Sequence, residues 1–220
     1  EDAKVDASDW TDLAVRSVSG NFIGDKTLER ETIIARYRKV NIKGKDLYQI
    51  CLGETPFYAE SGGQIGDTGV ILFPENNQEL KVLDTKKEDG MIIHVVDAKP
   101  RIPHDNKAIA KVDKYKRSYI TNNHSATHLL HAALRKVLGK HVEQKGSLVN
   151  DEHLRFDFSH FSKVTEEELS KIEALVNEKI RENISLNTEV MAIEKAKQLG
   201  AMALFGEKYG DTVRVVTFDK

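Results

Sequence analysis

The sequence has no means of forming an internal disulfide, because its 220 residues contain one cysteine, Cys51. A single thiol is typical of a protein in a reducing cytosol, so we expect a cytoplasmic location. No apolar run reaches the roughly 18 residues that a membrane-spanning helix needs, and no membrane partner is expected. Residues 1–10 are acidic and contain neither an initiator methionine nor the apolar stretch of a signal peptide. This beginning predicts a piece of a longer protein.

The chain also lacks a large net charge. Its 33 Lys and Arg residues nearly balance 35 Asp and Glu residues, for a net charge of −2. This net charge gives no sign of a nucleic-acid binder, and any RNA contact must come from a local basic patch. The alternative for each patch is a solvated strand face. The candidates are Arg30, Arg36, Arg38, Lys39, Lys43 and Lys45 in one patch, and Lys107, Lys111, Lys114, Lys116 and Arg117 in the other.

The first half of the chain has the pattern of a small all-β domain. Short stretches rich in β-branched residues are separated by turn signals such as Lys43-Gly44-Lys45-Asp46. Cys51 falls within one of these stretches and is interpreted as an inert strand residue. Close spacing of short strands favours a closed barrel over a sandwich. The predicted strands are 33–42, 47–52, 69–73, 80–85, 91–96 and 108–112.

The second half changes to helical periodicity after Asp113. Asn122 or Asn123 is predicted to cap a helix that runs to about Leu138, with Gly139 as its stop. Thr165-Glu166-Glu167-Glu168 has the form of a capping box that starts a second helix. The apolar residues of that helix are Leu169, Ile172, Val176, Ile180 and Ile184. Strands are predicted at 154–158, 190–193 and 213–218, and a short helix near 194–199.

These patterns predict an α+β fold in two domains. An extension, 1–14, precedes a β-barrel domain at 15–114 that carries a glycine-rich loop. An α+β domain at 115–220 follows, in which helices pack on an antiparallel sheet.

His124 and His128 are the sharpest chemical feature. Residues four apart on a helix lie on one face, so both imidazoles can point at a single metal ion, as zinc sites require. Spacing alone leaves a second interpretation equally open, namely two solvated or core histidines, because a chance pair is common among eight histidines. His131 is expected to pack beside the pair or support it.

Two ligands do not complete a zinc site, which usually takes three or four from the protein. Cys51 lies in a predicted strand of the other half, and His141, His153 and His160 show no ligand spacing. The site is therefore predicted to be incomplete within this chain.

The glycine-rich loop, 55–69, has four glycines in eight residues. Glycine permits positive φ and close approach, so the loop can present N–H groups to an anion or a carbonyl oxygen. It matches neither the Walker phosphate loop nor the dinucleotide fingerprint. The alternative is a barrel loop with tight turns, in which Asp67 caps a turn rather than acting as an acid or base.

A third feature is Lys208 in the segment 204–211, before the last predicted strand. In the first interpretation, this lysine contacts a phosphate or the substrate. In the second, it is a solvated turn residue.

Taken together, several segments resemble the editing region of alanyl-tRNA synthetases. The glycine-rich loop has the Ala59-Glu60-Ser61-Gly62-Gly63-Gln64 form of bacterial synthetases, whereas free-standing editing proteins more often carry a proline and an extra glycine there. The other matching stretches are 123–131, 141–147, 154–160 and 201–214. Nearly the whole chain beyond about residue 20 is covered.

The resemblance implies a fold and an activity. The fold is a small β-barrel followed by an α+β editing core shared with threonyl-tRNA synthetase. The activity is hydrolysis of Ser-tRNA(Ala) and Gly-tRNA(Ala), in a parent enzyme that ligates alanine to tRNA(Ala) with ATP. The partners implied are the acceptor end of tRNA(Ala) and the remainder of the synthetase chain.

The resemblance also implies a set of site residues. Zinc is held by His124 and His128 together with a Cys-Gly-Gly-Thr-His sequence, expected shortly after Phe218 and beyond Lys220. Thr55, Gln64 and Lys208 are assigned to the reaction, and Gly62, Gly63 and Gln144 to substrate binding. Zinc either activates water or holds the substrate's α-amino group. The alternatives are a catalytically silent tRNA-binding fragment and a free-standing deacylase.

Overall fold

The computed structural model describes residues 6–13, 20–201 and 210–218, which belong to two compact units. The barrel unit comprises Glu1–Thr121 with Asn150–Glu152, and the second unit comprises Asn122–Val149 with His153–Lys220. The division falls within helix α1 (Lys114–Leu138). Across the described ranges, no helix combines the length and apolar character needed to cross a bilayer.

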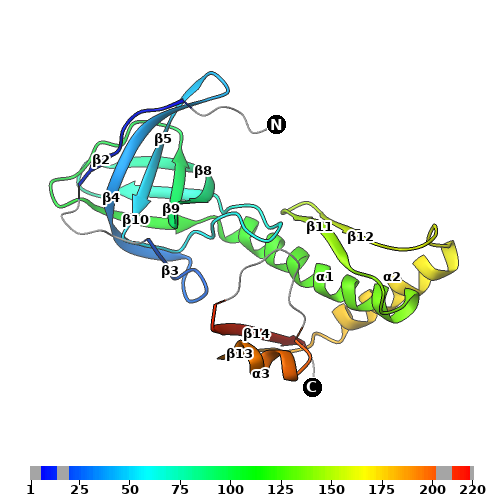
Figure 1. Cartoon of the computed structure of the whole chain (residues 1–220). Coiled ribbons are helices and arrows are strands. Elements are labelled where there is room, and N and C mark those ends of the chain that lie inside the picture. The colour runs from blue at the N-terminus through cyan, green and yellow to red at the C-terminus, as the bar shows by residue number, and fades with distance from the viewer. Residues whose placement is uncertain (1–5, 14–19, 202–209, 219–220) are drawn as a thin grey trace. The chain divides into compact units, whose positions relative to one another are not determined.

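The barrel unit is a closed antiparallel β-barrel (Figure 1). Each strand pairs with its neighbour in the ring, and the pairing of β4 with both β10 and β5 closes it. This arrangement confirms the predicted small barrel and leaves the six ring strands without a free edge. In ring order the strands are β4 (Glu29–Ile42), β10 (Lys107–Val112), β7 (Gly69–Phe73), β8 (Gln78–Glu88), β9 (Met91–Val96) and β5 (Lys45–Leu52).

Four short strands lie outside this ring. β1 (Asp6–Ala7) and β2 (Thr11–Asp12) pair with β4. β3 (Asn21–Phe22) pairs in parallel with β6 (Glu54–Thr55), at the start of the glycine-rich loop. None of the four was predicted, because two residues carry no detectable periodicity.

Large apolar side chains fill the barrel core, as the alternation of the predicted strands requires. The cluster has twelve buried members, contributed by strands on all sides of the ring and by the loop residue Phe57. Cys51 is buried as well, and burial raises the pKa of its thiol to about 11, which confirms that it is an inert strand residue. The largest fully buried members are Phe57, Phe73, Ile34, Ile50, Leu52, Ile71 and Leu80.

Helix α1 begins eight residues before the predicted caps Asn122 and Asn123, so that prediction was wrong. Asp113 is the true start signal, because its carboxylate accepts the N–H groups of Tyr115 and Lys116 at 3.1 and 3.0 Å. Gly139 does end the helix, with a φ of +120°.

The described residues of the second unit form part of α1, two further helices, one β-hairpin and one further pair of antiparallel strands (Figure 1). β11 (Gln144–Val149) pairs with β12 (Leu154–Phe158), and β13 (Leu186–Ala192) pairs with β14 (Thr212–Phe218). α3 (Ile193–Gln198) lies between β13 and β14 in the chain. α2 (Glu166–Arg181) begins with the predicted capping box at Thr165 and ends before Ile184, which therefore lies outside the helix.

The core of the second unit lies between α1, α2 and the β11–β12 hairpin. Its buried members are Ala133, Leu134, Val142 and Ile172, with Phe156 and Phe158 of β12 packed against them. Helices packed on antiparallel strands agree with the α+β class predicted for this half.

Candidate functional site

The tip of the glycine-rich loop is a tight turn. Ser61 and Gln64 exchange two backbone hydrogen bonds, N–H to O=C, at 3.1 and 3.0 Å. Between them, Gly62 and Gly63 have φ values of +58° and +83°. A two-residue turn with positive φ at both central positions is of the I′ type, which strongly favours glycine. The loop thus has the tight turn that the structural alternative predicted. The contacts of its residues to substrate remain predictions.

The loop is fixed at its base by Gly66 and Asp67. A Cβ on Gly66 would lie 2.1 Å from the carbonyl oxygen of Thr85, so only glycine fits against β8. The Asp67 side chain is buried, and its carboxylate accepts the N–H of Tyr58 at 2.7 Å. This contact confirms that Asp67 stabilises the loop's turn structure.

Asp67 also forms an ion pair with Arg117 of α1. The Nε of Arg117 lies 2.9 Å from Oδ1 of Asp67, and Nη2 contacts Oδ2. The same guanidinium donates to the carbonyl oxygens of Gly24 and Pro56, both at 3.0 Å. Arg117 therefore joins three segments of the barrel unit, and this use of its donors removes it from the basic patch suggested by the sequence.

Thr55, at the start of the loop, is fully buried and bonded to His94 of β9. His94 Nδ1 lies 2.9 Å from the carbonyl oxygen of Ile50, which can only accept, so Nδ1 carries the proton. Burial lowers the pKa of His94 to about 4, so the ring is neutral and its Nε2 is an acceptor. The Thr55 hydroxyl must then donate to Nε2, over 2.8 Å, while it accepts the N–H of Phe57.

His124 and His128 lie side by side on α1, as their spacing predicted. Their ring centroids are 5.1 Å apart and the ring planes differ by 18°. Burial lowers the pKa of His128, which favours the neutral imidazole that a metal ion requires.

This pair fits two positions of a tetrahedral zinc site. With Zn–N distances of about 2.0–2.1 Å, two imidazoles on one zinc have centroids roughly 5 Å apart. Within the described ranges, however, no group of three or more His, Cys, Asp or Glu side chains could hold a metal ion. The described residues thus offer two candidate ligands, and the metal role of the pair stays a prediction.

His131 packs next to the pair, where the sequence placed it. The ring is buried, and neither nitrogen has a hydrogen-bond partner among the described residues. Burial and the nearby Arg135 guanidinium lower its pKa. Its ring lies 5.1 Å from that of Phe156, which indicates a supporting role in the core.

The remaining predicted residues fall in different places. Gln64 is buried in the barrel unit, in the same loop as Gly62 and Gly63. Gln144 begins β11 in the second unit, and its Nε2 donates to Oγ of Ser147 at 3.1 Å. Lys208 lies outside the described residues. The second unit thus holds His124, His128 and Gln144, and the barrel unit holds Thr55 with the loop.

The fold brings together two histidines for which the sequence showed no common pattern. His141 Nε2 lies 2.9 Å from His160 Nδ1, and the ring of Phe161 stacks on His141 with centroids 4.4 Å apart. The cause is the β11–β12 register, in which Gln144 pairs with Phe158. The sequence analysis did not predict β11, so it had no hairpin register from which to infer this cluster.

Ion pairs neutralise most of both basic patches. In the first, Arg30, Arg36, Arg38 and Lys39 each pair with a carboxylate. In the second, Lys107 pairs with Asp105, Lys111 with Glu29, and Arg117 with Asp67. The solvated strand face was therefore the better interpretation for most of these residues. Within the described part of the chain, no carboxylate pairs with Lys43, Lys45, Lys114 or Lys116.

Residues 4–116 match the family model described as tRNA synthetases class II (A). Relatives named alanine–tRNA ligase cover the chain end to end. One from Cytophaga hutchinsonii is 58% identical over 220 residues, 99% of this chain and 24% of that protein. One from Bacteroides fragilis is 54% identical over 217 residues, 98% of this chain and 24% of the relative.

A third, from Christiangramia forsetii, is 50% identical over 221 residues, 99% of this chain and 25% of the relative. The chain thus spans about a quarter of the length of the curated relatives it matches. On these matches, the chain belongs to the family of class II tRNA synthetases (A), as a segment that corresponds to part of an alanine–tRNA ligase.

Proposed function

We propose that this segment hydrolyses the ester bond that links serine or glycine to tRNA(Ala). It would thereby edit the mischarged product of a parent alanine–tRNA ligase. The parent would join alanine to tRNA(Ala) with ATP, in the cytoplasm. The observation that carries the proposal is the side-by-side placement of His124 and His128 on α1. The tRNA and the amino acid are inferred from the relatives, which are alanine–tRNA ligases.

The need for such a step follows from physical chemistry. A pocket that accepts alanine cannot strongly reject glycine or serine, because a methyl or hydroxyl difference changes binding by only about 1–3 kcal/mol. A second site that hydrolyses the wrong ester supplies the missing discrimination. The proposal is supported by the neighbouring histidines of the α+β unit and by the glycine-rich loop of the barrel unit.

The assigned roles follow from what each group can donate or accept. His124 and His128 would hold zinc, with two further ligands from the expected Cys-Gly-Gly-Thr-His sequence. When bound, zinc supplies Lewis-acid chemistry, either by activating water near neutral pH or by holding the substrate's α-amino group. The backbone N–H groups of Gly62 and Gly63 would stabilise negative charge on the ester carbonyl oxygen.

The remaining residues are assigned to positioning and recognition. Gln64 would hydrogen-bond the serine hydroxyl or the carbonyl oxygen. Gln144 would contact the terminal adenosine, and Lys208 a phosphate or the aminoacyl group. Thr55 holds the start of the loop through its bonds to His94 and Phe57. The partner is the acceptor end of tRNA(Ala).

Deacylation of Ser-tRNA(Ala) tests the proposal. The protein is the present chain extended through the expected Cys-His pair, and the double variant His124→Ala, His128→Ala should lose both bound zinc and ester hydrolysis. The matched control is His104→Ala, which removes an exposed histidine of the barrel unit. Full hydrolysis by the double variant would refute the proposed role of the pair.

A second candidate function is a tRNA-binding module without catalytic activity. It is favoured by the finding that, in the part of the chain that the structure describes, three metal ligands do not come together. Zinc content and tRNA affinity of the 220-residue chain, measured side by side, separate the two candidates. Affinity without zinc or turnover supports the silent module, whereas zinc retained by the pair supports the editing site.

A further inference from the structure

We propose that the exposed surface of the first two turns of α1 binds unpaired nucleotides of an RNA, with Tyr115 and Tyr119 stacking on bases from one side of the helix. Lys114 and Lys116, which flank that side, contact phosphates. We call these four residues the tyrosine face. The identification of that RNA as tRNA rests on the proposed function. The surface itself belongs wholly to the barrel unit and is separate from the histidine pair of the second unit.

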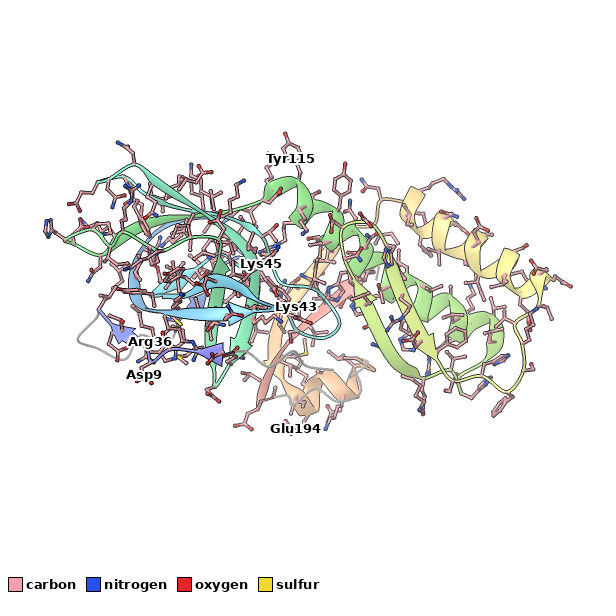
Figure 2. All side chains as sticks on the ribbon, turned by 90° about the horizontal axis from the view of Figure 1, so that it is seen from above. Asp9, Arg36, Lys43, Lys45, Tyr115 and Glu194 are labelled. Atoms are coloured by element: carbon pink, nitrogen blue, oxygen red, sulfur yellow. The ribbon has the colours of Figure 1, made fainter. Side chains whose placement is uncertain are left out.

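The two tyrosines are exposed to an unusual degree. Tyr115 is 76% exposed and Tyr119 is 60% exposed. They are four residues apart on α1, so their rings lie on one side of the helix, one turn apart. Figure 2 shows the Tyr115 side chain projecting outward from the start of the helix. Aromatic side chains of this size usually bury most of their area, so two on one exposed face indicate a binding surface.

The charges around the tyrosines are the reverse of the usual pattern. The first turn of α1 contains no acidic residue and carries Lys114 and Lys116, although cations are unfavourable at the positive end of the helix dipole. In α2 the corresponding turn carries Glu166, Glu167 and Glu168. An anionic partner would offset the unfavourable charge in α1.

The two lysines are also available, unlike their neighbours. Arg117 is bonded to the buried Asp67, and Lys111 pairs with Glu29 over 3.2 Å. Among the residues that the structure describes, neither Lys114 nor Lys116 has a carboxylate partner. Asp113 is committed to capping the helix through the N–H groups of Tyr115 and Lys116.

Exposed aromatic rings combined with unpaired cations suit single-stranded RNA. Every base offers a π-face for stacking, and the phosphates on either side of it supply the negative charge. A paired duplex keeps its bases inside the helix, so the tyrosine face would select unpaired segments. If a protein or another part of the parent chain covered this face instead, RNA affinity would not depend on the two tyrosines.

The test compares RNA affinities of the 220-residue chain and its variants. The probes are a tRNA(Ala) transcript with its unpaired 3′ end and a blunt RNA hairpin without unpaired ends. We expect Tyr115→Ser with Tyr119→Ser to weaken transcript binding about 10-fold or more, the effect of losing one or two stacked bases. The double Tyr→Phe variant keeps the rings and should bind like the parent chain.

The lysines are tested by the salt dependence of binding. Lys114→Gln with Lys116→Gln should reduce the slope of log affinity against log salt by roughly 1.4, two single-strand phosphate contacts. The matched control is Lys43→Gln with Lys45→Gln, two exposed lysines of the β4–β5 turn that are labelled in Figure 2, and it should leave the slope unchanged.

Three results would overturn the proposal. They are unchanged transcript affinity in the double serine variant, equal loss in the serine and phenylalanine variants, and equal binding of the hairpin and the transcript. Each can occur while hydrolysis by the extended chain still depends on His124 and His128. Conversely, full ester hydrolysis by the His124→Ala, His128→Ala variant would refute the editing site without affecting the RNA-binding measurement. The two failures are therefore distinguishable.

Discussion

The barrel unit and the second unit reach their folds by different means. The barrel closes on itself, buries large apolar side chains inside the ring and can hold a neutral histidine and an Arg–Asp pair away from water. The hydrophobic cluster described for the second unit has four buried members. In β13, most residues are exposed to solvent. Local features, namely the α2 cap and the register of the β11–β12 hairpin, carry more of its structure.

The comparison teaches where polar groups contribute to stability. Inside the closed barrel, removing one partner leaves the other buried and unsatisfied, so the cost is large. In the second unit the exposed ends of helices face water, and the loss of one contact is partly replaced by solvent. We therefore expect the effects of polar substitutions to fall in the order given below.

The largest expected effect is that of Arg117→Met. The substitution leaves the Asp67 carboxylate buried without its cation, and we expect the barrel unit to lose about 3–5 kcal/mol of unfolding free energy. Urea unfolding followed by the fluorescence of the single tryptophan, Trp10, reports on this unit because Arg38 of β4 lies 4.3 Å from its ring. The control is Arg30→Met at an exposed pair, which should cost less than about 1 kcal/mol. Equal losses in both variants would contradict the distinction between buried and exposed pairs.

The next effect is an acid-dependent loss of barrel stability caused by His94. Burial lowers its folded pKa to about 4, whereas the unfolded chain takes up the proton near pH 6.5. Stability is therefore intact above pH 6.5 and falls as the pH drops toward 4, by about 3 kcal/mol. Unfolding curves followed by Trp10 fluorescence from pH 7 to 4 measure this decrease in the unfolding free energy of the barrel unit. His94→Gln should remove this part of the pH dependence, and an unchanged slope in that variant would show that other groups cause it.

The smallest of the three is Thr165→Ala in the second unit. It removes the capping-box bond from the Glu168 N–H to Oγ1 of Thr165, while the backbone N–H of residue 165 can still donate to the Glu168 carboxylate. We expect about 1 kcal/mol less protection of the α2 amides in hydrogen exchange. The Trp10 transition of the barrel unit should not move. Ser170→Ala, an exposed position inside the same helix, is the control and should not reduce protection. A shift of the barrel transition in Thr165→Ala would mean that the two units unfold together.

The sequence was informative where a side-chain period dominates. The α2 capping box and the His124–His128 pair could be predicted because each depends on spacing along one element. The barrel could be predicted because several short strands follow one another closely. The start of α1 was misplaced because the segment before Asn122 was interpreted as a basic patch, and the carboxylate of Asp113 was not considered as a cap. β11 was missed because Gly146 and the register irregularity beside it interrupt the alternation.

What could not be predicted depends on contacts between distant residues. Arg117 was a member of a candidate basic patch with a solvated face as the alternative, yet its partner Asp67 lies 50 residues earlier in the chain. His141 and His160 meet only through the register of a hairpin. The hydrogen-bond direction at Thr55 follows from a histidine 39 residues away. No local pattern contains this information.

The Arg117–Asp67 pair also decides how the protein can be divided. A fragment that stopped at Val112, where the last barrel strand ends, would keep every strand of the ring and yet leave a carboxylate in the interior with no cation. The first turn of α1 is thus electrostatically a piece of the barrel. Anyone who excises this barrel for expression, or transplants its glycine-rich loop to another scaffold, should carry the helix start along with it.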